Sequence, residues 1–445
     1  MEIYSLLGKK FTCSECGQEH FVETKHIEKG STEDLPVFLK AIFGEDRKVF
    51  LLADNITWEA AGEKCESCIK EGNAVTSLVL HPQGENKVTA RESYLKDIQE
   101  KARSSDVILT VGTGTVTDLG KITGNVLGKP VVCFPTAPSM NGYTSPVAAY
   151  IKDGLKLTVP VRPACGVFID NKILKDAPVE LIKSGFADSL AKSFANADWK
   201  ISSFVTGENF CPLPYKIVSR SEKTYMEKGD MLLKKDTLTI NNLMEGLTLG
   251  GISMMLAGKS SPASGGEHMI SHFLDMFSHQ YRKEIFAYHG LQVGTGVFVS
   301  SLLYEEMKDF KADDIRNFLA VTKIDYCRHL QSLLSLFPAG ADLIRKEFSE
   351  KMRQIMLLRE ALPEKWEEMK KEAFCMVYGP KKIESVFRKT EIPLHMSELG
   401  VGKEIIHDTI MFSRFIRGRL SILDIAGETG ILEKFAGQYA AQSIS

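Results

Sequence analysis

Histidines gather in one segment of this sequence, GGEHMISHFLDMFSHQYRKEIFAYHG (265–290), which holds four of the ten in the chain. His268 and His272 are four residues apart, so they lie on one face of a helix. Glu267 comes before the first histidine rather than after it, so the segment lacks the H-E-x-x-H pattern of zinc proteases. Each histidine alone is more simply a core or surface residue. Together, beside a Gly-Gly pair, they predict a divalent metal site that keeps an open position.

An oxygen ligand for this metal site has more than one candidate. Asp188 lies early in a helix-like segment, SGFADSLAKSF, whose neighbouring residues are small and apolar. Asp198 and Asp275 offer the same carboxylate chemistry, and spacing alone does not choose among the three. The residues by themselves therefore leave the ligand set open.

A strand, a glycine turn and the start of a helix are predicted for VILTVGTGTVTDLGK (107–121). Gly112 and Gly114 let the backbone approach a ligand closely, and the N–H groups at a helix start favour an anion. The pyrophosphate of a dinucleotide is a natural occupant. Because position 117 is threonine, the spacing is not G-x-G-x-x-G, and a tight turn without a ligand remains the alternative.

A second polar loop, FPTAPSMNGYTSP (134–146), follows the next predicted strand. Successive strands of such a sheet tend to be neighbours, and ligands bind at the carboxyl ends of the strands. We therefore expect the two loops to line one cofactor crevice. Asp54 ends the first strand of the alternating run, where it would bind a ribose diol and repel a 2′-phosphate, favouring NAD over NADP. Its alternative role is to cap a helix or a turn.

The scaffold for these residues is predicted by short apolar runs that alternate with helix-like stretches from about residue 48. Continuous apolar strands separated by helices are typical of a parallel sheet covered on both faces. The predicted strands are 49–54, 77–82, 107–112 and 131–134, and the predicted helices between them are 57–70, 89–103 and 116–127. An Asp-Gly pair also predicts a hairpin at 148–159.

After about residue 178 the apolar spacing becomes helical, with no convincing strand. The predicted helices include 178–206, 214–235, 237–257, 268–278 and 313–336. We therefore expect three parts in the chain. They are a Cys/His-containing extension (1–30), an α/β dinucleotide-binding domain (31–175) and an all-helical metal and substrate domain (176–445).

Composition sets wider bounds on the function. The 445 residues are 44% apolar and 25% charged, with a net charge of −2. These values exclude a disordered, collagen-like or disulfide-dense chain and give no sign of a nucleic-acid partner. No apolar stretch approaches the roughly 18 residues of a membrane span, and no signal peptide is visible. Nine cysteines in such a chain favour reduced thiols and a cytoplasmic location.

The N-terminal segment FTCSECGQEHFVETKH (11–26) contains a C-x₂-C-G pattern followed by two histidines. Cys13 and Cys16 have zinc-knuckle spacing, so together with His20 and His26 they could pin a small hairpin around a metal ion. A plain hairpin or an edge strand is the simpler interpretation of the segment. A second cysteine pair, in KCESCIK, has helical spacing and is more simply a pair of packing residues.

As a set, the motifs resemble the superfamily of iron-type alcohol dehydrogenases, glycerol dehydrogenases and dehydroquinate synthases. They are VGTGTVTDLGK, PTAPSMNGYTSP, SGFADSLAK with NADWK, SGGEHMISHFLD, YHGLQVG and RGRLSILDIAGETGIL, in the superfamily's order over about residues 48–435. The set looks most like bacterial members that reduce dihydroxyacetone phosphate to sn-glycerol 1-phosphate. The resemblance implies a dehydroquinate synthase-like fold and a metal-dependent, NAD(P)-dependent dehydrogenase.

The resemblance also assigns roles to residues of the site. The metal ligands would be Asp188, His268 and His289, and the substrate would contact Asn141, Asp188 and His272. The cofactor contacts would be Asp54, Gly114, Thr115, Val116, Thr117, Asp118, Thr136, Ala137, Pro138, Ser139 and Ser145. NAD(H) would be preferred with NADP(H) accepted, and zinc would be the default metal, with nickel or iron also suited to these ligands. We also expect a homo-oligomer.

The implied reaction is hydride transfer between the nicotinamide and C2 of dihydroxyacetone phosphate, with the metal polarising the carbonyl. One position departs from the superfamily, which usually has an aspartate where this chain has Asn141. Asparagine keeps the hydrogen-bonding shape but lacks the charge. Two alternatives with the same fold therefore stay open, a glycerol or polyol dehydrogenase and a dehydroquinate synthase-like cyclase. A third alternative, from another class, is a nucleotide-sensing protein without turnover.

Overall fold

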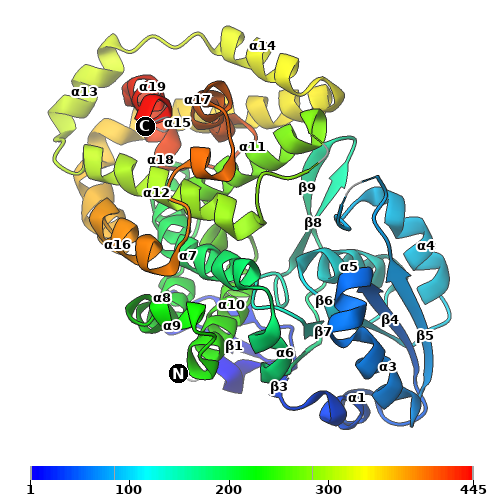
Figure 1. Ribbon diagram of the computed structural model, residues 1–445. Coiled ribbons are helices and arrows are strands. Elements are labelled where there is room, and N and C mark those ends of the chain that lie inside the picture. Colours follow the sequence, from blue (N-terminus) through cyan, green and yellow to red (C-terminus); the bar gives the residue numbers. More distant parts are fainter. Residues whose placement is uncertain (1–2, 85, 283, 443–445) are drawn as a thin grey trace. The chain divides into compact units, whose positions relative to one another are not determined.

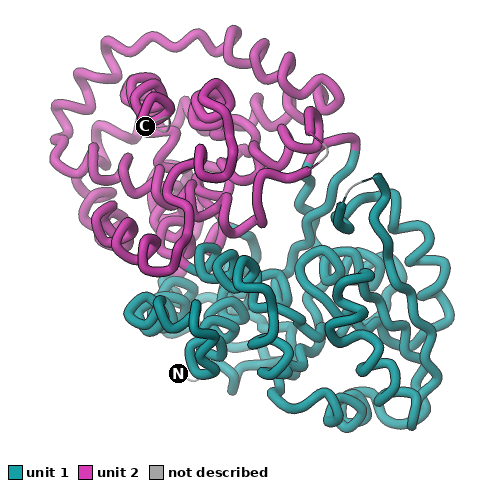
Figure 2. The backbone as a smooth tube through the Cα atoms, in the orientation of Figure 1, with its two compact units in different colours: residues 1–152, 156–189, 212–260 teal, residues 153–155, 190–211, 261–445 magenta. Residues whose placement is uncertain are grey.

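The computed structural model describes residues 3–84, 86–282 and 284–442 (Figure 1). The chain divides into two compact units, shown in different colours in Figure 2. Unit 1 comprises residues 1–152, 156–189 and 212–260, and unit 2 comprises residues 153–155, 190–211 and 261–445. The domain boundaries expected after residues 30 and 175 rest on changes in the sequence pattern, and they stay predictions.

Unit 1 contains a six-stranded sheet with the order β3-β10-β7-β6-β4-β5. The strands are β3 (His26–Lys29), β4 (Lys48–Asp54), β5 (Ala74–Leu80), β6 (Val107–Gly112), β7 (Val131–Pro135) and β10 (Gly166–Ile169). Every neighbouring pair is parallel, so the carboxyl ends of the strands meet at one edge. The predicted parallel α/β sheet is confirmed.

Two strands of this sheet, β3 and β10, were missed in the sequence. β3 is an edge strand that pairs with β10 in the register His26↔Gly166. Its sequence, HIEK, has only one strongly apolar residue and no exposed-buried alternation. Its place in the sheet therefore depends on backbone pairing with a strand far along the chain, for which its side chains give little signal.

The core of unit 1 lies between the sheet and the helices α1 (Leu35–Phe43) and α3 (Glu63–Lys70). Fully buried side chains of the central strands, among them Leu51, Leu109 and Phe134, form one cluster with residues of these helices. Burying a side chain of this size contributes roughly 1.5–3 kcal/mol. The strands are continuously apolar for this reason, as the sequence pattern indicated.

Two smaller sheets complete the β structure. They pair β1 (Lys10–Thr12) with β2 (Glu19–Phe21), and β8 (Val147–Lys152) with β9 (Leu155–Pro160). At the predicted Asp-Gly turn, Asp153 and Gly154 have φ values of 51° and 76°. Positive φ at both central residues is the geometry of a type I′ hairpin turn, which matches the twist of the flanking strands.

All described elements after β10 are helical. The α-helices before β10 are α1, α2 (Asn55–Thr57), α3, α4 (Glu92–Ala102) and α5 (Gly114–Leu127). The later ones are α6 (Asn171–Asp176), α7 (Val179–Thr206), α8 (Pro212–Glu227), α9 (Asp230–Leu233), α10 (Thr237–Ala257), α11 (Gly266–Tyr281), α12 (His289–Met307), α13 (Ala312–Val321), α14 (Tyr326–Leu336), α15 (Ala341–Ala373), α16 (Pro380–Thr390), α17 (Lys403–Phe412), α18 (Ile422–Glu428) and α19 (Ile431–Gln442). None of the helices in the described ranges is both long and apolar enough to cross a membrane.

Two helices that the sequence predicted as continuous are each broken in two. The segment 214–235 is divided between α8 and α9, and the segment 313–336 between α13 and α14. In the second case Thr322 is extended, and the Asp325 carboxylate accepts a hydrogen bond from the Arg328 N–H. That cap begins a new helix, and helical spacing of apolar residues does not reveal such a break.

Candidate active site

Asp188, His268 and His289 lie together in the structure. Each offers one ligand atom, and the three atoms all lie within 4.8 Å of one another. Asp188 is in α7, His268 is in the first turns of α11, and His289 is the first residue of α12. Asp188 and His268 are buried and His289 is half-buried. One carboxylate oxygen and two imidazole nitrogens are the donor set of a catalytic divalent metal site, which leaves room for a substrate ligand.

Hydrogen bonds orient two of these three side chains. The Asn141 N–H donates to Oδ2 of Asp188 over 3.1 Å. Oε1 of Glu267 lies 2.8 Å from Nδ1 of His268 and also accepts from the Gly265 N–H over 2.7 Å. Because Nδ1 of His268 is bonded to a carboxylate, Nε2 is the ring nitrogen that is suited to a cation.

His289 is oriented by a chain of polar side chains. Oγ of Ser271 lies 3.0 Å from Nδ1 of His289 and 3.4 Å from Oε1 of Gln292, whose amide donates to Asp275 over 3.1 Å. Every donor finds an acceptor when His289 Nδ1–H donates to Ser271 and Ser271 donates to Gln292. This arrangement assigns Nε2 of His289 to the ligand position. Asp275, one of the candidate ligands, thus accepts a hydrogen bond from Gln292 in this series of side chains.

Asp198, the remaining candidate oxygen ligand, makes other contacts. Its carboxylate accepts hydrogen bonds from the Gly266 N–H, the Ile422 N–H and the Tyr304 hydroxyl over 2.8, 2.9 and 2.7 Å. Burial, and secondly the charge of Glu267, raise the pKa of Asp198 to about 7. These bonds join α7 to the starts of α11 and α18, so Asp198 holds the helices in place.

His272 lies beside the two histidines of the ligand group. Its ring centroid is 6.2 Å from that of His268 and 5.9 Å from that of His289. Nη2 of Arg417 donates to Nδ1 of His272 over 3.1 Å, so a neutral His272 carries its proton on Nε2. Burial, and secondly the charge of Arg419, lower the pKa of Arg417 to about 10. Arg417 is therefore still a cation at neutral pH.

The glycine turn after β6 lies directly beside the loop after β7. The Thr136 N–H donates to the Gly112 carbonyl over 3.2 Å, which joins the two loops as the sequence predicted. A Cβ atom at Gly112 would lie 2.8 Å from Cβ of Val116, so the turn requires glycine. α5 begins at Gly114, and the side chain of its N-cap residue, Thr113, makes no capping hydrogen bond to the first turn. Such a helix start favours a phosphate.

The loop that holds residues 136–139 packs against α7. A Cβ atom at Gly185 would lie only 1.7 Å from the carbonyl oxygen of Pro138, so α7 and the loop are in backbone contact there. The Tyr143 hydroxyl donates to the Ala137 carbonyl over 2.6 Å. The loop of expected cofactor contacts is therefore held against the helix that carries Asp188.

Lys121, which the sequence did not point to, organises the end of the second polar loop. Its buried ammonium donates to the Gly142 and Val147 carbonyls over 2.8 and 2.7 Å and to the Ser145 hydroxyl over 3.0 Å. Ser145 is thus held within its own loop, and its contact with a cofactor stays a prediction. Asp118 lies 3.9 Å from the same ammonium, and burial raises the pKa of its carboxyl to about 6.

Asp54 caps a helix, which was its alternative role. Its Oδ1 accepts a hydrogen bond from the Thr57 N–H over 2.7 Å at the start of α2. Its contact with a ribose therefore stays a prediction. Among the other expected cofactor residues of the two loops, Gly114, Thr115 and Asp118 are half-buried and Val116, Thr117, Thr136, Ala137, Pro138 and Ser139 are buried.

Comparisons with known proteins agree with this fold. The profile of the iron-containing alcohol dehydrogenase family matches residues 26–178. The chain superimposes on a probable glycerol dehydrogenase from Sinorhizobium meliloti 1021 with a TM-score of 0.61 at 14% identity, over 93% of this chain and 98% of that chain. An iron-containing alcohol dehydrogenase from Thermococcus thioreducens gives a TM-score of 0.60 at 16% identity, over 94% and 99% of the two chains. The fold is that of the iron-containing alcohol dehydrogenase class.

Curated relatives narrow this class further. A glycerol-1-phosphate dehydrogenase from Halalkalibacterium halodurans is 32% identical over 342 residues, which is 74% of this chain and 84% of the relative. Another from Bacillus licheniformis is 27% identical over 98% of this chain and 97% of its own length. The chain belongs to this family, the NAD(P)-dependent glycerol-1-phosphate dehydrogenases. The predicted family, fold class and enzyme class, a dehydrogenase that acts on a CH–OH group, are confirmed.

Proposed function

We propose that this enzyme reduces the C2 carbonyl of dihydroxyacetone phosphate with NAD(P)H and forms sn-glycerol 1-phosphate. The observation that carries the proposal is the group formed by Asp188, His268 and His289, linked to the polar loop after β7 through the Asn141 N–H. This hydrogen bond connects a candidate cation site with a candidate nucleotide site. The relatives in the family are named for glycerol 1-phosphate, which supports the substrate.

The donor set fits a resident divalent cation. Asp188, His268 and His289 would hold it, and each of the three side chains has a hydrogen-bonding partner that fixes its orientation. A divalent cation in this position supplies a Lewis acid that polarises a carbonyl group. We propose zinc, with nickel or iron as the alternatives that suit the same nitrogen and oxygen ligands.

Hydride transfer needs a substrate that is held in one orientation. With NAD(P)H and substrate bound, the cofactor would supply a hydride to C2 of the substrate, and a proton from solvent would complete the hydroxyl group. We propose that His272 donates from Nε2–H to a substrate oxygen. Arg417 supports this role, because its bond to Nδ1 holds the tautomer in which Nε2 carries the proton.

A phosphorylated substrate also requires a cationic partner. Arg417 lies beside His272, is half-buried and remains charged at neutral pH. A guanidinium matches phosphate oxygens with paired N–H donors, and such bonds are strong where water is excluded. We therefore propose that Arg417 binds the substrate phosphate.

For the cofactor, we propose that the pyrophosphate lies at the start of α5, along Gly114–Asp118, and that the nicotinamide half lies along Thr136–Ser139. The hydrogen bond between the two loops supports this arrangement. We propose that Asp54 binds the adenosine ribose with the oxygen that does not cap α2. Its charge would favour NAD over NADP, because it repels a 2′-phosphate.

The test is NADH oxidation with dihydroxyacetone phosphate and, in parallel, with unphosphorylated dihydroxyacetone, before and after treatment with a chelator. We expect activity only with the phosphorylated ketone, loss of activity with the chelator, and recovery when a divalent metal is added back. Equal rates with both ketones would favour a polyol dehydrogenase, which Asn141 keeps open as an alternative. Phosphate release without net NADH oxidation would favour a cyclase.

The cellular location and the oligomeric state of the enzyme complete the proposal. We propose that the enzyme is a cytoplasmic homo-oligomer, as expected from its cysteine usage and from the resemblance. Light scattering after gel filtration would measure the number of subunits, and a monomeric enzyme would contradict the proposed homo-oligomer.

A further inference from the structure

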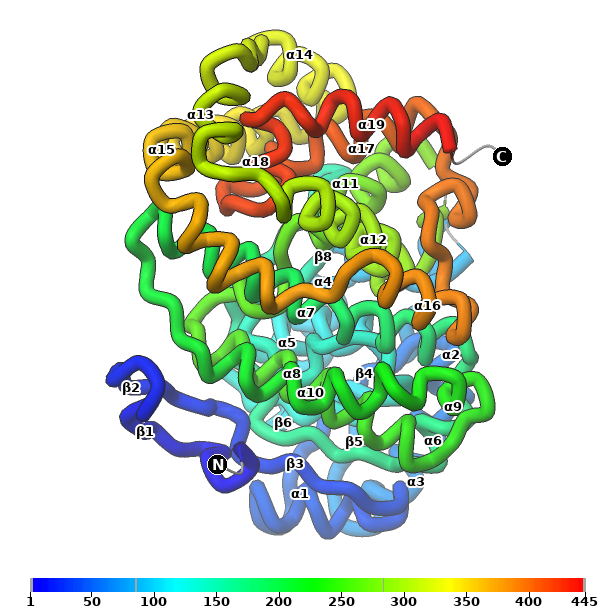
Figure 3. The backbone as a smooth tube through the Cα atoms, turned by 90° about the vertical axis from the view of Figure 1, so that its left-hand side faces the viewer, coloured from blue at the N-terminus to red at the C-terminus, as the bar shows by residue number. Residues whose placement is uncertain are grey.

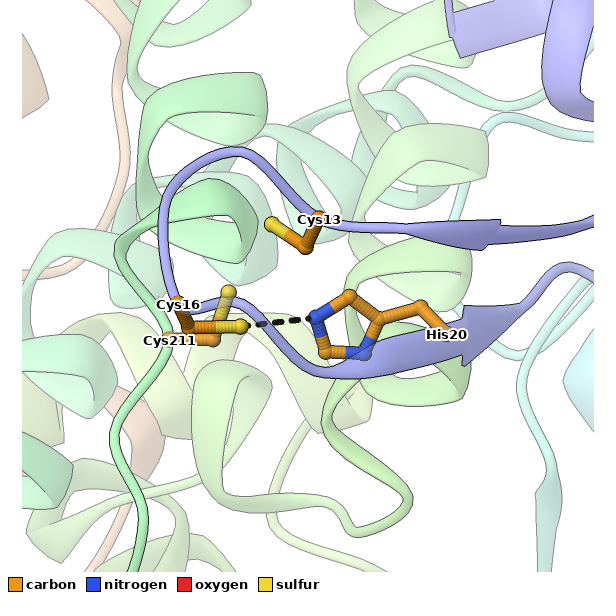
Figure 4. A group of neighbouring side chains, drawn as sticks. All are labelled: Cys13, Cys16, His20 and Cys211. Atoms are coloured by element: carbon orange, nitrogen blue, oxygen red, sulfur yellow. Dashed lines mark hydrogen bonds between the residues drawn. The ribbon is translucent and has the colours of Figure 1, made fainter.

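A second group of potential metal ligands lies outside the candidate active site. Cys13, Cys16, His20 and Cys211 each offer one ligand atom, and these four atoms all lie within 4.8 Å of one another. Figure 4 shows the three sulfur atoms and a ring nitrogen of His20 turned toward a common centre. We propose that this group binds a structural zinc ion, distinct from the cation of the active site.

The turn between β1 and β2 has the backbone form of a zinc knuckle. The Cys13 N–H donates to the Gln18 carbonyl over 2.8 Å, and the Gly17 N–H donates to the Cys13 carbonyl over 2.9 Å. Gly17 has a φ of 72°, a left-handed conformation that favours glycine in this C-x₂-C-G sequence. The Glu15 N–H lies 3.4 Å from the Cys13 sulfur, so the backbone offers a donor that would stabilise a thiolate.

The fourth ligand comes from far along the chain. Cys211 immediately precedes Pro212, the first residue of α8. An ion pair of 2.6 Å between Lys216 of α8 and Glu15 of the knuckle holds the same two segments together. Cys211 therefore completes a group for which the sequence had offered His26 as a possible member. His26 is not part of the group, because it is in β3, where it pairs with Gly166 and faces Phe38 edge-on.

The donor set identifies the metal. Three thiolates and one imidazole form the Cys₃His set of structural zinc sites, and four protein ligands close the coordination sphere. A tetrahedron with Zn–S bonds of about 2.3 Å separates its sulfur atoms by about 3.8 Å, which fits the observed limit of 4.8 Å. Cys16 Sγ and His20 Nε2 are already 3.2 Å apart. Thiolate ligands also select zinc over the hard cations magnesium and calcium.

The surroundings of the group agree with a structural role. Cys13, His20 and Cys211 are 2%, 7% and 4% exposed, although β1 and β2 have only three residues each. A two-stranded hairpin of this size is barely stable alone. It leads directly into β3, the edge strand of the main sheet (Figure 3). A zinc ion would fasten the hairpin to the segment before α8 and so hold the start of the chain in place.

The experiment measures metal content in the full-length enzyme and in three variants. We expect one equivalent of zinc in wild-type protein that a mild chelator does not remove. Cys211→Ser should lose that equivalent, whereas His268→Ala should keep it and lose only the active-site metal. Cys375→Ser, at an exposed cysteine, is the matched control and should keep both metals. Wild-type zinc content in Cys211→Ser would overturn the proposal.

Two measurements do not depend on the folding of a cysteine variant. Titration of wild-type thiols with a mercurial, in the presence of a zinc-sensitive dye, should release the tightly held zinc. Protein purified with cobalt should show thiolate-to-cobalt charge-transfer absorption in both wild type and His268→Ala, because the active-site group has no sulfur ligand. No zinc release and no such absorption would overturn the proposal, as would a disulfide between Cys13 and Cys16 or iron in place of zinc. None of these outcomes bears on the proposed reductase activity.

Discussion

Glu267→Gln tests the orientation of His268 most directly. In the structure one oxygen of Glu267 accepts from both His268 Nδ1 and the Gly265 N–H, over 2.8 and 2.7 Å. Glutamine has nearly the same shape and retains one carbonyl oxygen. It lacks the negative charge that strengthens both bonds and makes the imidazole a better ligand. We therefore expect weaker metal binding with an intact fold.

The expected loss of metal affinity follows from the role of Glu267 as the charged partner behind His268. Loss of one charged partner behind a ligating histidine typically weakens metal affinity about 10–100-fold, or roughly 1.4–2.7 kcal/mol. Competition with a chromogenic chelator measures this affinity directly. Saturating metal should restore most of the turnover of Glu267→Gln, because the ligands themselves remain. In the wild-type protein the negative charge of Glu267 raises the pKa of Asp198. Removal of that charge should therefore lower the pKa of Asp198.

The matched control is Glu305→Gln, at an exposed position on α12 that forms an ion pair with Lys308 one turn away. It should leave metal affinity and turnover unchanged. A metal affinity of Glu267→Gln within about threefold of wild type would refute the reasoning, because Glu267 would then not support a ligand.

The other predictions concern the cofactor loops, the substrate and stability. Gly185→Ala places a methyl group against the Pro138 carbonyl, so the KM for NADH should rise about 10–100-fold while metal content stays the same, as steady-state kinetics and metal analysis would show. Asp54→Asn should lower the ratio of kcat/KM for NADH over NADPH about tenfold, and an unchanged ratio would leave Asp54 only its cap on α2. Arg417→Lys should raise the KM for dihydroxyacetone phosphate about 10–100-fold with little change for NADH, and equal effects on both would argue against a phosphate contact. Asp118 keeps its proton better in the folded state, with a pKa of about 6 against 3.8, so its ionisation destabilises the protein as pH rises through this window. Relative to wild type, Asp118→Asn should therefore gain up to about 3 kcal/mol in free energy of unfolding between pH 4 and pH 7, and a constant difference in denaturant unfolding would refute this.

Much of the fold was predictable because it depends on patterns of residues within single strands, helices and turns. The central strands β4, β6 and β7 are largely apolar runs, and the helices between the strands have apolar residues at helical spacing. The Asp-Gly turn also has a local cause, since its conformation requires positive φ. Each of these signals depends on residues within one element, so a single sequence is enough to read it.

The edge strand β3 and the residues that support the site were harder to predict from the sequence. Glu267 and Arg417 both lie within motifs that the sequence drew attention to, yet their roles depend on contacts that spacing does not show. Gly185 is required only because the Pro138 loop lies against α7. These features exist because distant segments meet, and no local periodicity records such a meeting.

The sequence by itself determined the kinds of chemistry that this protein can perform, since the clustered histidines, the glycine turn and the cysteine knuckle are visible as residue types at short spacing. Only the tertiary structure decided which side chains share a centre. The resemblance pointed to Asp188, which residue spacing did not single out from Asp198 and Asp275. The tertiary structure brings the Asp188 carboxylate together with His268 and His289. It also places Cys211 with the knuckle, which nothing in the sequence had indicated. The physical reason is that coordination and hydrogen bonding act over a few ångströms in space, whereas these partners are separated by tens to hundreds of positions along the chain.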